Sequence, residues 1–137
     1  MTVLLVHQGD AEATERTAQI LSGDGHAVRT ISETDLSGEG AADDSPDLVI
    51  VFSEMYREEA TLGLCRRIRA SERFGHAPLL AAVSMYQMPL ANRIKSMSGA
   101  HFIFAPVEPD DLRARIEMMT EAAEGGSESD DEGAEEA

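Results

Sequence analysis

The chain has few cations and only one cysteine. Its 137 residues carry 26 acidic and 11 basic side chains, the formal net charge is −15, and Lys95 is the only lysine. A surface that binds nucleic acid or an anionic membrane needs clustered cations, whereas these are dispersed, so we expect neither partner. The single cysteine, Cys65, excludes an internal disulfide, and we interpret it as a small core residue.

Long hydrophobic runs and basic leader sequences are also lacking. The first apolar run, residues 2–6, is too short for a signal peptide or a membrane span, and we interpret it as a first buried strand. We therefore expect a cytoplasmic protein. The four histidines have no cysteine or histidine partner at ligand spacing, which favours ordinary loop or edge histidines over a metal site. They are His7, His26, His76 and His101.

The sequence is organised around a five-residue apolar run that begins at Leu48. A short, β-branched run of this kind predicts a strand covered on both faces, as in the centre of a parallel sheet. Ligands and chemistry in such sheets lie at the carboxyl ends of the strands. Here that position is Phe52, whose side chain cannot act as nucleophile, acid, base or metal ligand. The centre of the protein is therefore expected to be non-catalytic.

Strand and helix patterns alternate along the chain, which implies an α/β fold with a parallel sheet and helices on both faces. Residues 33–45 contain five acids and a single large apolar side chain, Leu36, so we expect a loop or one turn there and a second helix that is short or missing. The expected strands are 2–6, 27–31, 48–52, 79–83 and 101–104, and the expected helices are 11–22, 58–70, 89–98 and one from 109.

Apolar spacing also predicts which helix faces are buried. In the helix over 58–70 we expect the three arginines Arg66, Arg67 and Arg69 to face outward. The expected inner positions are Leu64 and Ile68 with Ala60 or Cys65 in that helix, Ala13, Thr17, Ile20 and Leu21 in the first helix, and Leu112, Ile116 and Met119 in the last.

The last residues form an acidic segment. Residues 124–137 include seven carboxylates among Gly, Ser and Ala, and no larger apolar side chain. Such a segment cannot compensate the entropy lost on ordering, so we expect it to be disordered. The predicted organisation is one domain over residues 1–122, followed by a disordered acidic tail over residues 123–137.

Several segments, in order and spacing, resemble the receiver domain of two-component response regulators over residues 2–119. They are Thr2 to Val6, Pro46 to Val51, Met55, Leu64 to Arg69, Pro78 to Leu80, Gly99-Ala100, Ala105-Pro106 and Glu108 to Leu112. The resemblance implies a flavodoxin-like, doubly wound sheet of five parallel strands in the order 2-1-3-4-5. It also implies an aspartate at the end of the third strand that accepts a phosphoryl group from a histidine kinase.

Transferred position by position, the resemblance implies that the chemistry of this family is missing. The two acidic positions that hold Mg²⁺ fall on His7 and Gln8, and the phosphoacceptor position falls on Phe52. The conserved lysine of the family corresponds to Ala105. The hydroxyl position after the fourth strand falls on Val83 or Ser84, and we favour Ser84. The aromatic switch position falls on Phe102.

We therefore expect a pseudo-receiver that is not an enzyme, needs no cofactor and acts as a protein–protein interaction module. Its partner would be a signalling protein or a second copy of the chain. In receivers the fourth helix, fifth strand and fifth helix form the face that meets partners. For each aromatic and methionine side chain on that face of this chain, the alternative to contact with a partner is packing against the sheet. The predicted face comprises Met85, Tyr86, Met88, Phe102, Phe104 and Pro106.

Three alternatives stay open at this point. If the correspondence with the family is shifted by one position, Ser53 becomes the phosphoacceptor with Glu54 nearby. The chain would then be a phosphoacceptor or relay that uses Ser53 or Ser84. Asp10 or Glu12 could serve as metal ligands, although both suit the positive end of the first helix. A small-ligand sensor would need the space at the acceptor position, most of which Phe52 would fill.

Overall fold

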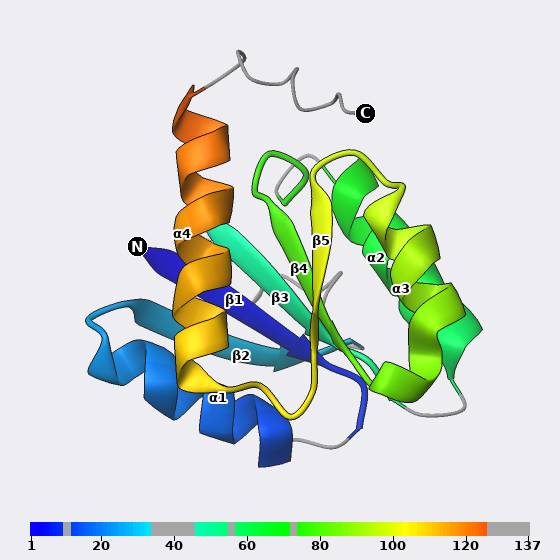
Figure 1. The fold of residues 1–137 in the computed structure, drawn as a ribbon, viewed down its shortest axis with the longest axis horizontal. Helices are drawn as coiled ribbons and strands as arrows, with labels where there is room; N and C mark the ends of the chain where they lie inside the picture. Colours follow the sequence, from blue (N-terminus) through cyan, green and yellow to red (C-terminus); the bar gives the residue numbers. More distant parts are fainter. Residues whose placement is uncertain (10–11, 34–45, 55–56, 72–73, 126–137) are drawn as a thin grey trace. The chain divides into compact units, whose positions relative to one another are not determined.

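The computed structural model describes residues 1–9, 12–33, 46–54, 57–71 and 74–125 of the chain. The chain divides into two compact units, Met1–Val107 and Glu108–Ala137. The first unit contains a five-stranded sheet and three α-helices, and the second contains the helix α4 (Figure 1). The expected loop over 33–45 lies outside the described residues, apart from Glu33, and so does most of the expected acidic tail.

The sheet of the first unit is parallel throughout and has the strand order β2-β1-β3-β4-β5. This order confirms the predicted flavodoxin-like architecture. All five predicted strands are present, and three of them are one residue longer than expected. Their bounds are β1 (Thr2–His7), β2 (Ala27–Ser32), β3 (Leu48–Phe52), β4 (Leu79–Val83) and β5 (Ala100–Phe104).

The central strands are buried on both faces, as their apolar runs predict. Every residue of β3 and β4 is buried, whereas β2, at the edge of the sheet, has no buried residue. Successive side chains of a strand point to opposite faces, so the burial of whole strands requires cover on both sides of the sheet. The structure thus explains why these strands show continuous apolar runs and β2 shows alternation.

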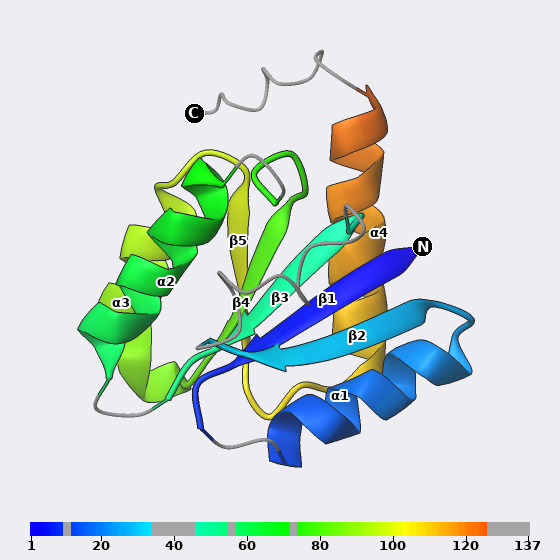
Figure 2. The same cartoon turned by 180° about the vertical axis from the view of Figure 1, so that it is seen from behind.

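The helices of the first unit are α1 (Glu12–Gly23), α2 (Glu58–Ala70) and α3 (Met88–Lys95). Helix α1 packs along β1 and β2, while α2 and α3 lie side by side in both views (Figures 1 and 2). One apolar cluster joins α2 and α3 to β1, β3 and β4, and it includes Cys65. Leu64 and Ile68 belong to the same cluster, so the predicted inner stripe of α2 is confirmed.

Two predictions about helices in the first unit were wrong. A short 3-10 helix, η3 (Met85–Gln87), precedes α3, and α3 ends at Lys95 instead of continuing to Ser98. The helix was expected only from Pro89 because the Ser84 N-cap upstream was overlooked. Arg69 does not face outward: it is half-buried, and its guanidinium donates to the carbonyl of Ala77, a contact between elements that helical spacing does not reveal.

The second unit consists, in its described part, of the helix α4 (Pro109–Gly125). It begins at the predicted residue, with Asp110 and Asp111 in its first turn, where carboxylates oppose the positive end of the helix dipole. The predicted stripe Leu112, Ile116 and Met119 is buried. The helix extends three residues beyond the expected domain end at residue 122. Among the described residues, no helix is both long and apolar enough to cross a membrane.

Candidate functional site

The candidate site lies where the carboxyl ends of β1, β3 and β4 meet. These strands are neighbours in register, with Val6 beside Val51 and Phe52 beside Ala82. The residues that follow them are therefore placed on one edge of the sheet. In sequence they are Gln8 after β1, Ser53 after β3 and Ser84 after β4.

Phe52 occupies the centre of this edge. It is the last residue of β3, and only 6% of its surface is exposed. It lines a cavity of about 60 Å³, which has room for about two water molecules. The structure thus brings three of the predicted positions, Gln8, Phe52 and Ala105, to one small cavity. Its full lining is Gln8, Gly9, Ala13, Phe52, Ser53, Glu54, Ala82 and Ala105.

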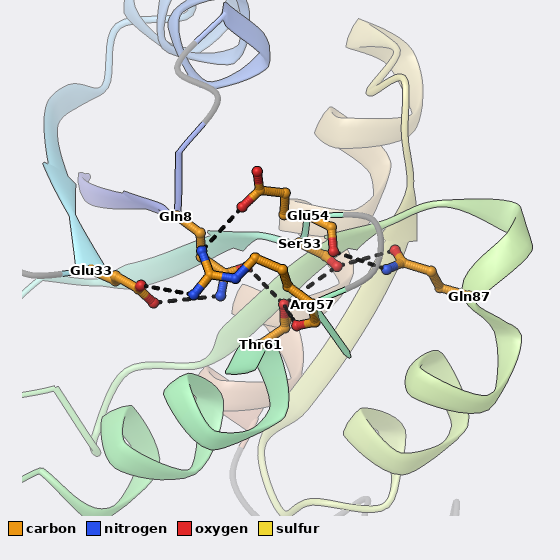
Figure 3. A network of polar contacts seen from close by, with 7 residues as sticks. All are labelled: Gln8, Glu33, Ser53, Glu54, Arg57, Thr61 and Gln87. Atoms are coloured by element: carbon orange, nitrogen blue, oxygen red, sulfur yellow. Dashed lines mark hydrogen bonds and ion pairs between the residues drawn. The ribbon is translucent and has the colours of Figure 1, made fainter. Parts of the chain in front are cut away.

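The charge at this edge is balanced by Arg57, at the start of α2. One guanidinium nitrogen lies 3.4 Å from a carboxylate oxygen of Glu33, and the other lies 3.2 Å from one of Glu54 (Figure 3). Glu33 follows β2 and Glu54 follows β3, so one cation joins the segments after the two strands that flank β1. Both carboxylates already have a cationic partner supplied by the chain itself.

Gln8 takes part in the same network through both ends of its amide. Its Nε2 donates to the Glu33 carboxylate at 3.4 Å, and its Oε1 lies 2.7 Å from the hydroxyl of Thr61. The Thr61 side chain is fully buried and also lies 3.0 Å from the carbonyl of Arg57. Gln8 therefore acts as a neutral hydrogen-bonding group at a position where the resemblance places a carboxylate.

Ser53 and Ser84, the two alternative phosphoacceptors, both have hydrogen-bonded hydroxyl groups. The Ser53 hydroxyl donates to Oε1 of Gln87 at 3.1 Å, and the Ser84 hydroxyl accepts the backbone N–H of Tyr86 at 3.0 Å (Figure 3 shows Ser53 and Gln87). Neither contact is to a histidine or a carboxylate, the usual bases that activate a hydroxyl nucleophile. The arrangement orders the loops after β3 and β4.

The residues at this edge do not fit the magnesium ion that the resemblance implies. Mg²⁺ prefers carboxylate oxygens, whereas the two expected ligand positions hold a half-buried histidine, His7, and the hydrogen-bonded Gln8. The described part of the chain contains no group of three acidic, histidine or cysteine side chains able to hold a metal. Of the alternative ligands, Glu12 is exposed and 3.9 Å from Arg16, and Asp10 lies outside the described residues.

His7 and Cys65 each place a chemically capable side-chain atom in a buried position. Nδ1 of His7 is buried and has no hydrogen-bond partner among the described residues. The thiol of Cys65 is buried, and this burial raises its pKa from the ordinary 9.0 to about 12. The thiol therefore remains protonated at neutral pH and is a poor nucleophile, as expected for a core cysteine.

The predicted interaction face is partly exposed and partly packed. Exposed fractions are 64% for Met85, 85% for Tyr86 and 43% for Met88, and we call these three residues the Met–Tyr patch. Phe102 and Phe104 are half-buried, pack against the apolar cluster, and have ring centroids 5.3 Å apart. Tyr86 is therefore exposed, whereas the two phenylalanines belong largely to the packing of the sheet. Pro106 is exposed.

Four residues of the network were not identified from the sequence: Glu33, Arg57, Thr61 and Gln87. The spacing of Ser84 and Gln87 could have identified one of them, because a serine followed three residues later by glutamine is a capping-box signature. Arg57 and Glu54 are also close in sequence, but the contacts of Glu33 with Gln8 and Arg57, and of Thr61 with Gln8, join residues 24 to 53 positions apart. No local pattern predicts such pairs.

Comparison with known proteins supports the fold. No protein-family model and no curated protein matches the sequence. Among solved structures, the receiver domain of a histidine kinase from Syntrophus aciditrophicus is 16% identical, with a TM-score of 0.68 and 93% of each chain covered. A two-component response regulator from Clostridium difficile is 15% identical, with a TM-score of 0.69 and 88% of this chain and 96% of the other covered.

NtrX from Brucella abortus is 23% identical, with a TM-score of 0.72, and the match covers 89% of this chain and 27% of NtrX. All three matches have TM-scores of 0.68 to 0.72 over most of this chain. The chain therefore has the fold of the response-regulator receiver domain.

Proposed function

We propose that this chain is a phosphorylation-independent pseudo-receiver that acts in signal transduction by binding another protein. It would be a docking module without enzymatic activity of its own, and its partner would be a signalling protein or a second copy. The receiver fold makes two-component signalling the natural setting. A cytoplasmic location is part of the same proposal.

The observation that carries the proposal is the ring of Phe52 at the acceptor position. Phosphoryl transfer depends on an in-line nucleophile and on positive charge around the transferred group. Phe52 supplies no nucleophile, and Ala105 supplies no ammonium group. The guanidinium of Arg57 is already paired with Glu33 and Glu54. The cavity beside Phe52, about 60 Å³, is also far smaller than the roughly 300 Å³ at which small-molecule pockets begin.

The Met–Tyr patch supports a docking role. Exposed methionine and tyrosine side chains are enriched at protein interfaces because they bury a large area when a partner covers them. Met85, Tyr86 and Met88 follow one another closely at the start of η3 and α3. Because these side chains are exposed, they contribute little to the stability of the fold. This favours a role for them in contact with another molecule.

The second candidate function is a phosphoacceptor or relay that uses Ser53 or Ser84. It is favoured by the position of both hydroxyls at the carboxyl ends of β3 and β4. Their hydrogen bonds argue against it, because Ser53 donates to Gln87 and Ser84 caps η3. A relay would also need a metal ion to offset the phosphoryl charge.

Magnesium titration followed by amide NMR separates the two candidates. The docking module predicts that the amides of Gln8, Ser53 and Glu54 show no saturable shift as Mg²⁺ rises to millimolar concentration. Calcium and a sodium chloride series of matched ionic strength control for nonspecific binding by this acidic chain. A saturable shift confined to those amides would reject the docking module in favour of the relay.

A further inference from the structure

Gln87 is a buried polar residue whose hydrogen-bonding capacity is fully used. It lies in η3 and is 2% exposed. A carboxamide has two acceptor and two donor sites. Here Oε1 accepts from the Ser53 hydroxyl at 3.1 Å and from the Ser84 backbone N–H at 2.9 Å. Nε2 donates to the Glu54 carbonyl at 3.3 Å and to the Glu58 carboxylate at 3.4 Å.

Three of the four partners lie 29 to 34 positions before Gln87 in sequence, and the fourth, Ser84, lies three positions before it. Ser53 and Glu54 follow β3, Glu58 begins α2, and Ser84 follows β4. Figure 3 shows the Gln87 side chain directed from its own segment toward Ser53 and Glu54. One buried side chain therefore fixes the loop after β4 to the loop after β3.

Ser84 caps η3 from within this segment, but no buried side chain other than Gln87 ties the segment to the rest of the first unit. Between Val83, the last residue of β4, and Leu90 in α3, Gln87 is the only buried residue. Met85, Tyr86 and Met88, the Met–Tyr patch, surround it and are exposed. The segment thus has one inward polar anchor and three outward apolar side chains. Its conformation depends on hydrogen bonds to Gln87, because apolar burial within it is lacking.

We propose that Gln87 is a permanent clamp that holds the Met–Tyr patch in a single conformation. Gln87 is a positioning residue in this account, and it acts through the backbone of residues 84–87. The proposal rests on the proposed function in one respect: a docking surface that no phosphorylation switches must be ordered by the chain itself. It adds that this order is produced by one side chain at the end of β4.

Hydrogen exchange of individual amides tests the clamp. In Gln87→Ala the amides of Ser84 and Tyr86 should exchange at least tenfold faster than in the wild type, while the amides of β1 keep their rates. The Ser84 amide is the most specific probe, because its acceptor is the side chain that is removed. Gln19→Ala, an exposed glutamine in α1, is the matched control and should change neither amide.

A milder variant keeps the test decisive if Gln87→Ala fails to fold. Ser53→Ala removes one of the four contacts and should raise exchange of the Ser84 amide by about two- to fivefold, again without change in β1. Unchanged exchange at Ser84 in the folded variant would overturn the clamp. An equal rise in every amide would overturn it too, because Gln87 would then support the whole fold.

Failure of the clamp can be told apart from failure of the proposed function. Phosphoryl uptake by the wild-type chain would reject the pseudo-receiver, whatever the exchange rates at Ser84 are. Normal exchange in Gln87→Ala would reject the clamp even if the chain never accepts a phosphoryl group.

Discussion

The guanidinium of Arg57 lies 3.4 Å from the carboxylate of Glu33, although 24 positions separate the two residues in sequence. The same guanidinium also pairs with Glu54 at 3.2 Å. The chain thus supplies its own cation at the edge of the sheet where the resemblance places a metal ion. Two carboxylates can remain close together there without a bound ion.

Arg57→Ala should lower the free energy of unfolding by about 0.5–1 kcal/mol, because two half-exposed ion pairs are lost. The difference from the wild type should shrink in 1 M salt, which screens exposed charges. Urea denaturation at two salt concentrations measures both effects. Arg16→Ala, which breaks a longer and more exposed pair with Glu12, is the control and should cost less. A loss of stability that does not depend on salt would show that Arg57 acts by packing.

Phe52→Ala should lower the free energy of unfolding by about 3–5 kcal/mol, as expected when a buried aromatic ring is replaced by a methyl group. Phe102→Ala provides a comparison, because Phe102 is half-buried and should cost less. Chemical denaturation of both variants gives the two values. If Phe52→Ala cost under about 1 kcal/mol, the ring would not be a packing element, and its position would need another explanation.

Cys65 should be unreactive toward thiol reagents near pH 8 in the folded protein and react fully in denaturant, since its pKa is raised to about 12 by burial. The raised pKa also makes stability depend on pH. Between about pH 9 and pH 12 the unfolded thiol ionises while the folded thiol stays protonated, so the stability of the wild type should fall with rising pH. Cys65→Ala removes this dependence, so the difference between the two pH curves isolates it. A constant difference across this range would contradict the raised pKa.

Tyr86→Ser should change the free energy of unfolding by less than about 0.5 kcal/mol, because an exposed side chain contributes little to folding. The same substitution should weaken binding to a cognate partner, measured with the purified partner once it is identified. Thr30→Ser on the exposed surface of β2 is a control that should leave both quantities unchanged. Wild-type affinity in Tyr86→Ser would remove Tyr86 from the docking surface.

Much of the fold could be predicted from the sequence, because its signals are local. The apolar runs of β3 and β4 mark strands buried on both faces, and α2 was predicted with the residue bounds it has, Glu58–Ala70. Its spacing of Leu64 and Ile68 also defines its buried face. These features depend on residues within one element, so a single sequence contains the information.

The hydrogen-bond network at the site could be predicted only in part. The residues at the degenerate positions Gln8, Phe52 and Ala105 were named in advance and do line one cavity. Their polar neighbours were not, because the pairing of Ser53 with Gln87 depends on side-chain torsions of residues 34 positions apart. The outward assignment of Arg69 failed for the same reason, as its partner, Ala77, lies outside the helix.

Intact-mass spectrometry after incubation with acetyl phosphate and Mg²⁺ tests the central claim most directly. The pseudo-receiver account predicts an unchanged mass under conditions in which an active receiver domain, run in parallel, gains a phosphoryl group. A stoichiometric mass increase of one phosphoryl group on this chain would contradict the account.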